Sequence, residues 1–246
     1  MESTCLLKMQ AAAIVPSMSL ADNELSTAPP QASRRPRGRP RKTADERDDG
    51  NRRQELITGA ARLFRQQGFD ATTTRDIAAA VGMRSGSPFY HFESKEALLA
   101  AVMLEGMQGA LQRQQAALAR LAPGVTQRER LRALVRNHFD ALLGPDSDFI
   151  PVMLYEWRSL STAQRSDVNH LKDRYEAEWV PVFEALHASG ELGGQPVLAR
   201  LMIFGALNWS AQWYLPPSGR SARTRARATL DELTESALAL FLKEPA

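Results

Sequence analysis

The residues best suited to chemistry in this chain lie between positions 84 and 95, where small, aromatic and basic side chains are mixed. Tyr90 and His91 carry polar rings, and Gly86 and Ser87 stand shortly before them. Small residues are weak helix formers, but they let a helix approach a groove closely, while hydroxyls and rings can contact phosphates. A helix built only for stability would not expose Tyr90 and His91. The pattern therefore predicts a short helix, about residues 85–92, that reads DNA.

Lys95 indicates a further contact with the same partner. Ser94 can cap the helix that follows, which puts Lys95 in its first turn. The helix dipole disfavours a cation at this end, and a phosphate bound there would remove the conflict. We therefore expect Lys95 to contact the DNA backbone.

Two more helices must position the reading helix. Residues 52–67 mix apolar and basic side chains at helical spacing, and Gly68 can end that helix. A second helix is expected from Thr73, which forms the pattern of a capping box with Asp76. Gly82 then ends this helix in a tight turn. Together the segments predict a helix-turn-helix.

Ile57 to Leu99 resembles the DNA-binding domain of TetR-family transcriptional regulators. The matching segments are Ala60–Phe64, Gly68–Phe69, Thr72–Ala78, Gly82–Met83 and Gly86–Leu99. The resemblance implies DNA contacts along the second and third helices and at the start of the fourth. The residues are Thr74 and Arg75 near phosphates, Arg84, Ser85 and Ser87 at the base edges, Gly86 among them in the DNA-binding segment, and Tyr90, His91 and Lys95 on the backbone.

The sequence departs from the family pattern at Pro88-Phe89, where the family usually has an apolar residue followed by Tyr. Phe89 lacks the hydroxyl that would bind a phosphate. We expect Phe89 in the core, and Tyr90 in a position to take over its contact.

A basic arm precedes this region. Residues 1–50 lack sustained periodicity and are predicted to be disordered. Within them, residues 34–42 carry six basic side chains in nine positions. This segment resembles an AT-hook, whose core matches Arg37, Gly38, Arg39 and Pro40 and would enter a narrow minor groove. The alternative is a basic tail that only binds phosphates. Both interpretations predict that this segment is an arm that contacts DNA.

The composition argues against several other classes. Among 246 residues Cys5 is the single cysteine, so no disulfide within the chain is possible and a cytoplasmic setting is expected. Neither a signal peptide nor a membrane span is predicted. The four histidines form no metal-ligand pattern, and catalytic motifs are missing. We therefore predict no metal, no cofactor and no enzyme activity.

The rest of the chain is predicted to be an all-α body. Residues 166–189 are expected as a helix kinked at Pro181, and residues 196–215 as a helix that is apolar on nearly every side. The other predicted helices span residues 95–121, 126–143, 147–160 and 222–242. An all-round apolar helix must be covered on two sides, so the last two helices are expected to form a homodimer interface, as in the TetR pattern. A dimer would hold two reading helices about 34–36 Å apart, matching a palindromic operator.

An interior effector site is implied by the resemblance. We expect it among large side chains with polar tips, although aromatic residues at helical spacing are more often simply core. The candidates are Tyr155, Trp157, Arg158, Trp179, Asn208, Trp209, Gln212 and Trp213. The segments Tyr155–Leu160 and Gly205–Tyr214 resemble a TetR subgroup that includes acyl-CoA-responsive regulators, which implies a thioester ligand with Arg158 or Arg174 as phosphate partners.

The predicted organisation has three parts: a basic arm (1–50), a helix-turn-helix domain (51–96) and a ligand-binding and dimerisation domain (97–246). The predicted function is a dimeric repressor that a small hydrophobic or amphipathic effector releases from its operator. Two alternatives stay open: an architectural AT-hook protein without an effector, and a helical module that binds a small molecule.

Overall fold

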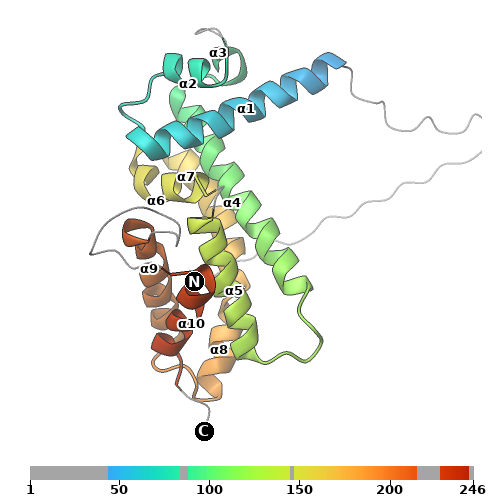
Figure 1. Ribbon diagram of the computed structural model, residues 1–246, viewed down its shortest axis with the longest axis vertical. Coiled ribbons are helices and arrows are strands. Elements are labelled where there is room, and N and C mark those ends of the chain that lie inside the picture. The colour runs from blue at the N-terminus through green and yellow to red at the C-terminus, as the bar shows by residue number, and fades with distance from the viewer. Residues whose placement is uncertain (1–43, 84–87, 145–146, 215–227, 244–246) are drawn as a thin grey trace, which may run out of the picture. The chain divides into compact units, whose positions relative to one another are not determined.

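The computed structural model describes residues 44–83, 88–144, 147–214 and 228–243. By its contacts the chain divides into residues 1–41 and 42–246, and the following description concerns the second unit. The described residues form helices without a named strand, and Leu192 and Leu242 make an isolated antiparallel bridge. The predicted all-α class is confirmed (Figure 1).

Two glycine turns and one capping box shape the N-terminal helices, which we call the head (residues 44–94). Helices α1 (Ala44–Gln67), α2 (Thr74–Ala80) and α3 (Pro88–His91) follow one another. Gly68 and Gly82 end the first two helices with φ of 85° and 68°, in the left-handed region that favours glycine. Thr73 and Asp76 form the predicted capping box at the start of α2.

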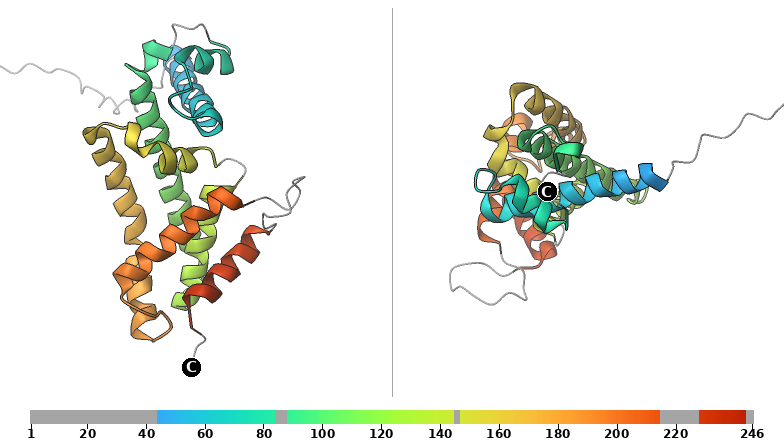
Figure 2. Two further views of the ribbon diagram at one scale, coloured as in Figure 1. Left: turned by 90° about the vertical axis from the view of Figure 1, so that its left-hand side faces the viewer. Right: turned by 90° about the horizontal axis from the view of Figure 1, so that it is seen from above.

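Helix α4 (Lys95–Ala119) links the head to the remaining helices, which we call the body (Figure 2). Ser94 caps it as predicted, accepting a hydrogen bond from the Ala97 N–H at 3.1 Å. α4 packs against α1, α5, α6 and α7. Gly106 lets α6 approach closely, because a Cβ at this position would lie 2.6 Å from Cβ of Phe149.

Three elements of the body follow α4. Helix α5 (Gln127–Leu143) begins with a capping box between Thr126 and Glu129 and ends at Gly144. Helix α6 (Phe149–Glu156) continues into a short 3-10 turn, η1 (Trp157–Ser159).

The predicted helix at 166–189 is wrong, because the structure has two helices there. Helix α7 (Thr162–Ala177) starts earlier, where Ser161 forms a capping box with Gln164, and helix α8 (Val180–Ala188) follows a break. Pro181 lies in the first turn of α8, where a helix needs no backbone N–H. The proline therefore marks a helix start and not a kink.

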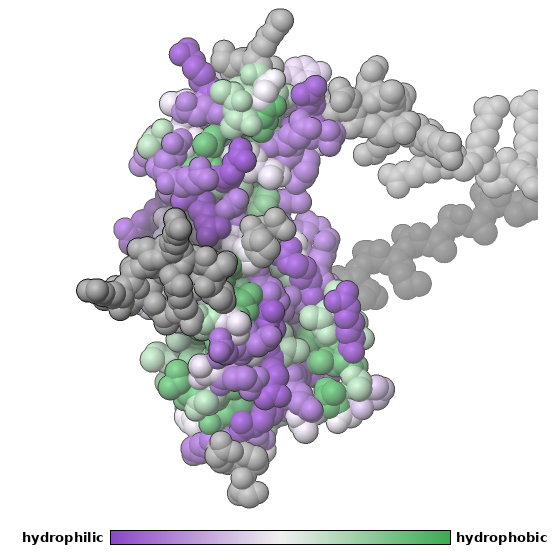
Figure 3. All heavy atoms as spheres, in the orientation of Figure 1, coloured by the Kyte–Doolittle hydropathy of each residue, from purple (hydrophilic) through white to green (hydrophobic). Residues whose placement is uncertain are grey.

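Helix α9 (Pro196–Trp213) is the apolar helix predicted at 196–215, and the apolar side chains on one side of it are exposed. Ile203 and Leu207 are buried against the chain's own core. Several large apolar side chains of α9 are instead more than half exposed: Val197, Leu198, Leu201, Met202 and Trp209. Apolar spheres gather at the lower left of Figure 3, on the side where α9 runs in Figure 1.

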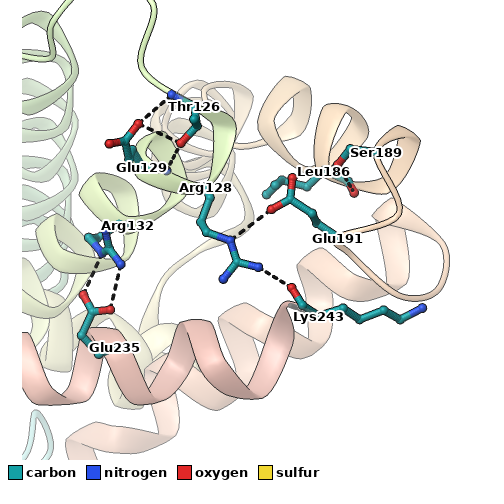
Figure 4. Close-up of polar contacts among 9 residues, drawn as sticks. All are labelled: Thr126, Arg128, Glu129, Arg132, Leu186, Ser189, Glu191, Glu235 and Lys243. Carbon is teal, nitrogen blue, oxygen red and sulfur yellow. Dashed lines mark hydrogen bonds and ion pairs between the residues drawn. The ribbon is translucent and has the colours of Figure 1, made fainter. Parts of the chain in front are cut away.

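Helix α10 (Leu230–Phe241) packs against α5, and ion pairs connect α5 to α10 and to Glu191 (Figure 4). Arg132 pairs with Glu235 at 2.7 Å. Arg128 pairs with Glu191 at 3.0 Å and donates a hydrogen bond to the Lys243 carbonyl. Leu233 and Leu238 of this helix, which was expected at a homodimer interface, are buried within the chain.

One apolar cluster runs through head and body, from Leu56 and Ile77 to Trp179 and Leu238. Within the described ranges, none of the helices combines the length and apolarity that crossing a membrane requires.

Candidate functional site

The start of α2 is held by hydrogen bonds within the head. Thr73 N–H donates to Asp76 Oδ2 at 2.9 Å, and Asp76 N–H donates to Thr73 Oγ1 at 3.2 Å. The hydrogen bonds from Thr73 keep the pKa of Asp76 below its ordinary value. Thr72, fully buried beside them, donates to the Gly68 carbonyl at 2.7 Å. The turn that presents Thr74 and Arg75 is thus closely defined.

Lys95 has a role inside the head that the sequence did not indicate. Its Nζ donates to the carbonyls of Phe69 and Thr72 at 2.8 and 3.0 Å and lies 4.1 Å from the centre of the Phe69 ring. The ammonium therefore ties the start of α4 to the turn before α2. This geometry also satisfies the cation without a phosphate, so the predicted backbone contact stays a prediction.

The other predicted DNA contacts fall into two groups. Tyr90 is 83% exposed and meets His91 edge to face, with ring centres 5.4 Å apart. Arg75 is exposed and Thr74 half-buried. The remaining predicted contacts lie outside the described residues: Arg84, Ser85, Gly86, Ser87 and the arm residues Arg37, Gly38, Arg39 and Pro40.

The body contains a pocket of about 430 Å³ among α4, α5, α6, α7 and α9. Most of its wall is apolar. The described residues that line it are Met107, Ala110, His138, Ala141, Ile150, Met153, Leu154, Trp157, Lys172, Tyr175, Glu176, Arg200, Leu201, Phe204 and Asn208. The volume lies in the range of about 300–1,000 Å³ that is typical of small-molecule sites.

His138 is the centre of a buried polar group at one end of the pocket. Its Nε2 lies 3.1 Å from Asn208 Oδ1, and its Nδ1 lies 3.1 Å from the Tyr175 hydroxyl. An amide oxygen only accepts, so Nε2 carries the proton and Nδ1 accepts from Tyr175. Burial lowers the pKa of His138 to about 4, although the bond to Asn208 opposes this shift. The imidazole is therefore neutral near pH 7.

Gln114 supports the same polar group through two hydrogen bonds. It is fully buried on α4, donates to the Tyr175 carbonyl at 2.8 Å and accepts from the Trp179 indole N–H at 2.8 Å. The Trp179 ring in turn lies 4.7 Å from that of Phe204 in the pocket wall. These contacts hold Tyr175 in place for His138.

Charged side chains gather at another part of the pocket wall. Glu176 pairs with Lys172 at 2.9 Å and also with Arg200. Their side chains are 15%, 42% and 26% exposed, respectively, whereas His138 is only 7% exposed. We call the more exposed, charged group the outer end of the pocket, and the group of the more buried His138, whose partner Asn208 is half-buried, its inner end.

The predicted effector residues are only partly brought together. Trp157 and Asn208 line the pocket, and Trp179 packs behind it. Gln212 Nε2 donates a hydrogen bond to the Tyr155 hydroxyl at 2.6 Å, and both residues line a separate pocket together with Arg65. Arg158, Trp209 and Trp213 do not line the pocket, and Arg158 and Trp209 are exposed.

Sequence reasoning missed most of the polar residues in the pocket wall and behind it. The missed residues are Gln114, His138, Lys172, Tyr175, Glu176 and Arg200. One signal was available, because Gln114 and His138 are polar residues on otherwise apolar helix faces, and buried polar groups need partners.

Helix α6 touches both the pocket and the head. Ile150, Met153 and Leu154 line the pocket on one side. At its two ends, Asp148 accepts a hydrogen bond from Arg65 of α1 at 2.9 Å, and Glu156 accepts one from the Phe69 N–H at 3.0 Å. The same carboxylates therefore join α6 to the end of α1 and to the turn that Lys95 binds.

Comparisons with known proteins match both parts of the chain. Residues 56–102 match "Bacterial regulatory proteins, tetR family", and residues 124–239 match "Tetracyclin repressor-like, C-terminal domain". The HTH-type transcriptional repressor KstR2 of Rhodococcus jostii (strain RHA1) is 30% identical over 187 residues, which cover 73% of this chain and 87% of that protein.

Solved structures agree in fold. The superantigen PfiT is 38% identical with a TM-score of 0.63, covering 78% of this chain and 96% of that one. AibR, solved with isovaleryl coenzyme A and operator DNA, is 24% identical with a TM-score of 0.67, covering 77% and 97%. The chain belongs to the TetR family of bacterial transcriptional regulators.

Proposed function

We propose that this protein is a dimeric repressor that leaves its operator when a small amphipathic effector, such as an acyl-CoA, enters the pocket of the body. The relative KstR2 is a transcriptional repressor, and the structural neighbour AibR has been solved with an acyl-CoA and operator DNA. The observation that carries the proposal is that α6 both lines the pocket and bonds to the head.

The effect of ligand binding on operator DNA would be transmitted through the two ends of α6. A ligand that moves Ile150 or Met153 shifts α6, and α6 holds the end of α1 and the Phe69 turn through Asp148 and Glu156. The two heads of a dimer would then leave the spacing that fits successive major grooves. The effector can shift this equilibrium only by its different affinity for the two arrangements.

The first experiment is footprinting on the DNA upstream of the protein's own gene, repeated with isovaleryl-CoA and longer acyl-CoAs. A palindromic footprint that an acyl-CoA removes supports the proposal. Uniform protection of AT-rich DNA, unaffected by any acyl-CoA, would favour the architectural alternative. Binding of an acyl-CoA without any footprint would favour the helical ligand-binding module.

A substitution at Glu156 tests the route from pocket to head. Glu156→Ala removes the acceptor for the Phe69 N–H, whereas Glu156→Gln keeps an oxygen in that position. We expect Glu156→Ala to bind effector normally but to release DNA several-fold less readily, and Glu156→Gln to resemble the parent. Equal release by all three proteins would argue against this route.

The proposed homodimer uses α9, with α10 at its side. Met202 is 72% exposed and Trp209 66%, and a monomeric protein rarely exposes several large apolar side chains together on one helix. Met202→Glu and Trp209→Glu should produce monomers in sedimentation equilibrium and abolish the palindromic footprint. Val180→Glu on α8, 39% exposed, is the matched control and should stay dimeric.

The proposed DNA contacts combine the head with the basic arm. Tyr90 and Arg75 present exposed side chains, and the arm at 37–40 is proposed to enter the minor groove. Removing residues 1–42 should lower affinity and flatten its dependence on salt, because fewer phosphate-bound cations are released. An unchanged salt slope after truncation would show that the arm does not contact DNA.

A further inference from the structure

We propose that the pocket takes an amphipathic anion whose charged group binds Lys172 and Arg200 at the outer end, while its uncharged body extends to the His138–Asn208 pair at the inner end. The inference rests on the proposed function in one respect, since it identifies this pocket as the effector site. It adds the residues that bind the ligand's negative charge and the orientation of the ligand in the pocket.

The outer end carries an excess positive charge. Lys172 and Arg200 share one carboxylate, Glu176, and Glu176 is the only carboxylate among the described lining residues. Two cations on one anion leave a net charge of one. Arg200 is only 26% exposed, so an ion pair with it is screened less than one at the open surface. A guanidinium also suits carboxylate and phosphate oxygens geometrically.

The inner end is uncharged. His138 is held neutral by burial, with Nε2 donating to Asn208 and Nδ1 accepting from Tyr175. A second negative charge at this end would lose its hydration and meet no cation, which is strongly unfavourable. The amide nitrogen of Asn208 still carries two N–H donors, which suit a neutral oxygen such as a carbonyl or hydroxyl.

The wall between the two ends is hydrocarbon. Met107, Ile150, Met153 and Phe204 supply thioether, aliphatic and aromatic surface without charge. A ligand therefore needs an apolar body between its anionic group and its far end. A free carboxylate and the phosphates of a CoA thioester share this chemistry at the outer end.

Tryptophan fluorescence of the full chain without DNA provides the test, because Trp157 lines the pocket. The probes are octanoate, octanol, octanedioate and octanoyl-CoA. We expect octanoate to bind at least about tenfold more tightly than octanol or octanedioate, a difference of about 1.4 kcal/mol. If octanoyl-CoA binds and octanoate does not, the anion is the CoA phosphate, and the dependence on Arg200 described next must then hold for octanoyl-CoA.

Variants at the outer end complete the test. Arg200→Gln and Lys172→Gln should weaken the anionic probe at least about fivefold without affecting octanol, and Glu176→Gln should strengthen it by removing the competing carboxylate. Arg120→Gln, an exposed cation at the C-terminal end of α4 and away from the pocket wall, is the matched control and should change nothing.

Three results would overturn the inference: octanol or octanedioate binding as tightly as octanoate, Arg200→Gln matching the parent, or none of the four probes binding. These results concern binding alone. If the expected pattern holds but no probe releases operator DNA, the ligand class stands and the proposed repressor function fails.

Discussion

The head and the body use polar side chains in opposite ways. In the head, Thr73 and Asp76 bond to each other, and Lys95 reaches back from the start of α4 to two backbone carbonyls, so that these polar side chains define the turn before α2. In the body, Gln114 and His138 point inward and bond to residues far away in the chain.

The polar side chains of the head therefore make its turns rigid, whereas those of the body surround a pocket. Bonds within the head fix the start of α2 and the turn before it, which would lower the entropic cost of binding a partner there. Polar groups inside the body are expensive unless they are all satisfied, and they are retained here around a pocket. Helix α6 is the element that both regions share.

The largest expected effect compares the part of the apolar cluster in the head with the part in the body. Trp179→Ala empties a fully buried site in the body and should lower the free energy of unfolding by about 3–5 kcal/mol. Ile77→Ala in the head should cost about 2–5 kcal/mol. Chemical denaturation followed by circular dichroism should show one transition for both variants. A separate early transition confined to Ile77→Ala would show that the head unfolds alone.

The next effect concerns the buried imidazole of the body. Because the pKa of His138 is about 4 in the fold and 6.5 in its absence, the unfolded chain binds a proton more readily. Stability is complete above about pH 6.5 and is lost as the pH falls toward 4, by on the order of 3 kcal/mol.

Denaturation at a series of pH values checks this, with His138→Phe as reference. The capping carboxylates Asp76, Glu129 and Glu232 also have lowered pKa values and lose their hydrogen bonds at acid pH in both proteins. The difference between parent and variant therefore isolates His138. A difference that does not change with pH would contradict the assignment.

Within the head, Lys95 and Tyr90 should behave differently. Lys95→Met removes two hydrogen bonds from an ammonium and should cost about 1–3 kcal/mol of stability. Tyr90→Ala, at an exposed position, should change stability by less than about 0.5 kcal/mol. Both should weaken operator binding in a mobility-shift assay.

The salt dependence of operator binding separates the two roles of Lys95. A side chain that only positions the Phe69 turn leaves the slope unchanged when it is removed, and that result would contradict the predicted phosphate contact. A slope reduced by about one would instead reveal the phosphate contact that the family resemblance implies.

A last comparison uses two equivalent capping boxes. Thr73→Ala in the head and Thr126→Ala in the body each remove the same kind of cap and should each cost about 1 kcal/mol. Only Thr73→Ala should also weaken operator binding, because it loosens the helix before the turn at Gly82. Equal affinities for DNA would show that α2 tolerates a frayed start.

Much of the fold could be predicted from local sequence patterns. The caps at Thr73 and Ser94 and the turns at Gly68 and Gly82 were predicted at the positions where the structure has them. The break between α7 and α8 was missed, because a proline is compatible with a kink inside a helix and with the first turn of a new one.

The pocket was much less predictable. Trp157 and Asn208 were predicted from their chemistry, but Trp209 was predicted with them although it lies on the exposed side of α9. Periodicity identifies an apolar helix and does not tell which of its sides meets the chain's own core.

The sequence by itself determined the all-α class, the head and its caps, because each of these depends on residues within a few positions of one another. Only the tertiary structure decided that His138 meets Asn208, that Lys172 and Arg200 share Glu176, and that Lys95 binds the Phe69 turn. Most of these pairs join different helices, and the relative placement of helices follows from the packing of the whole core.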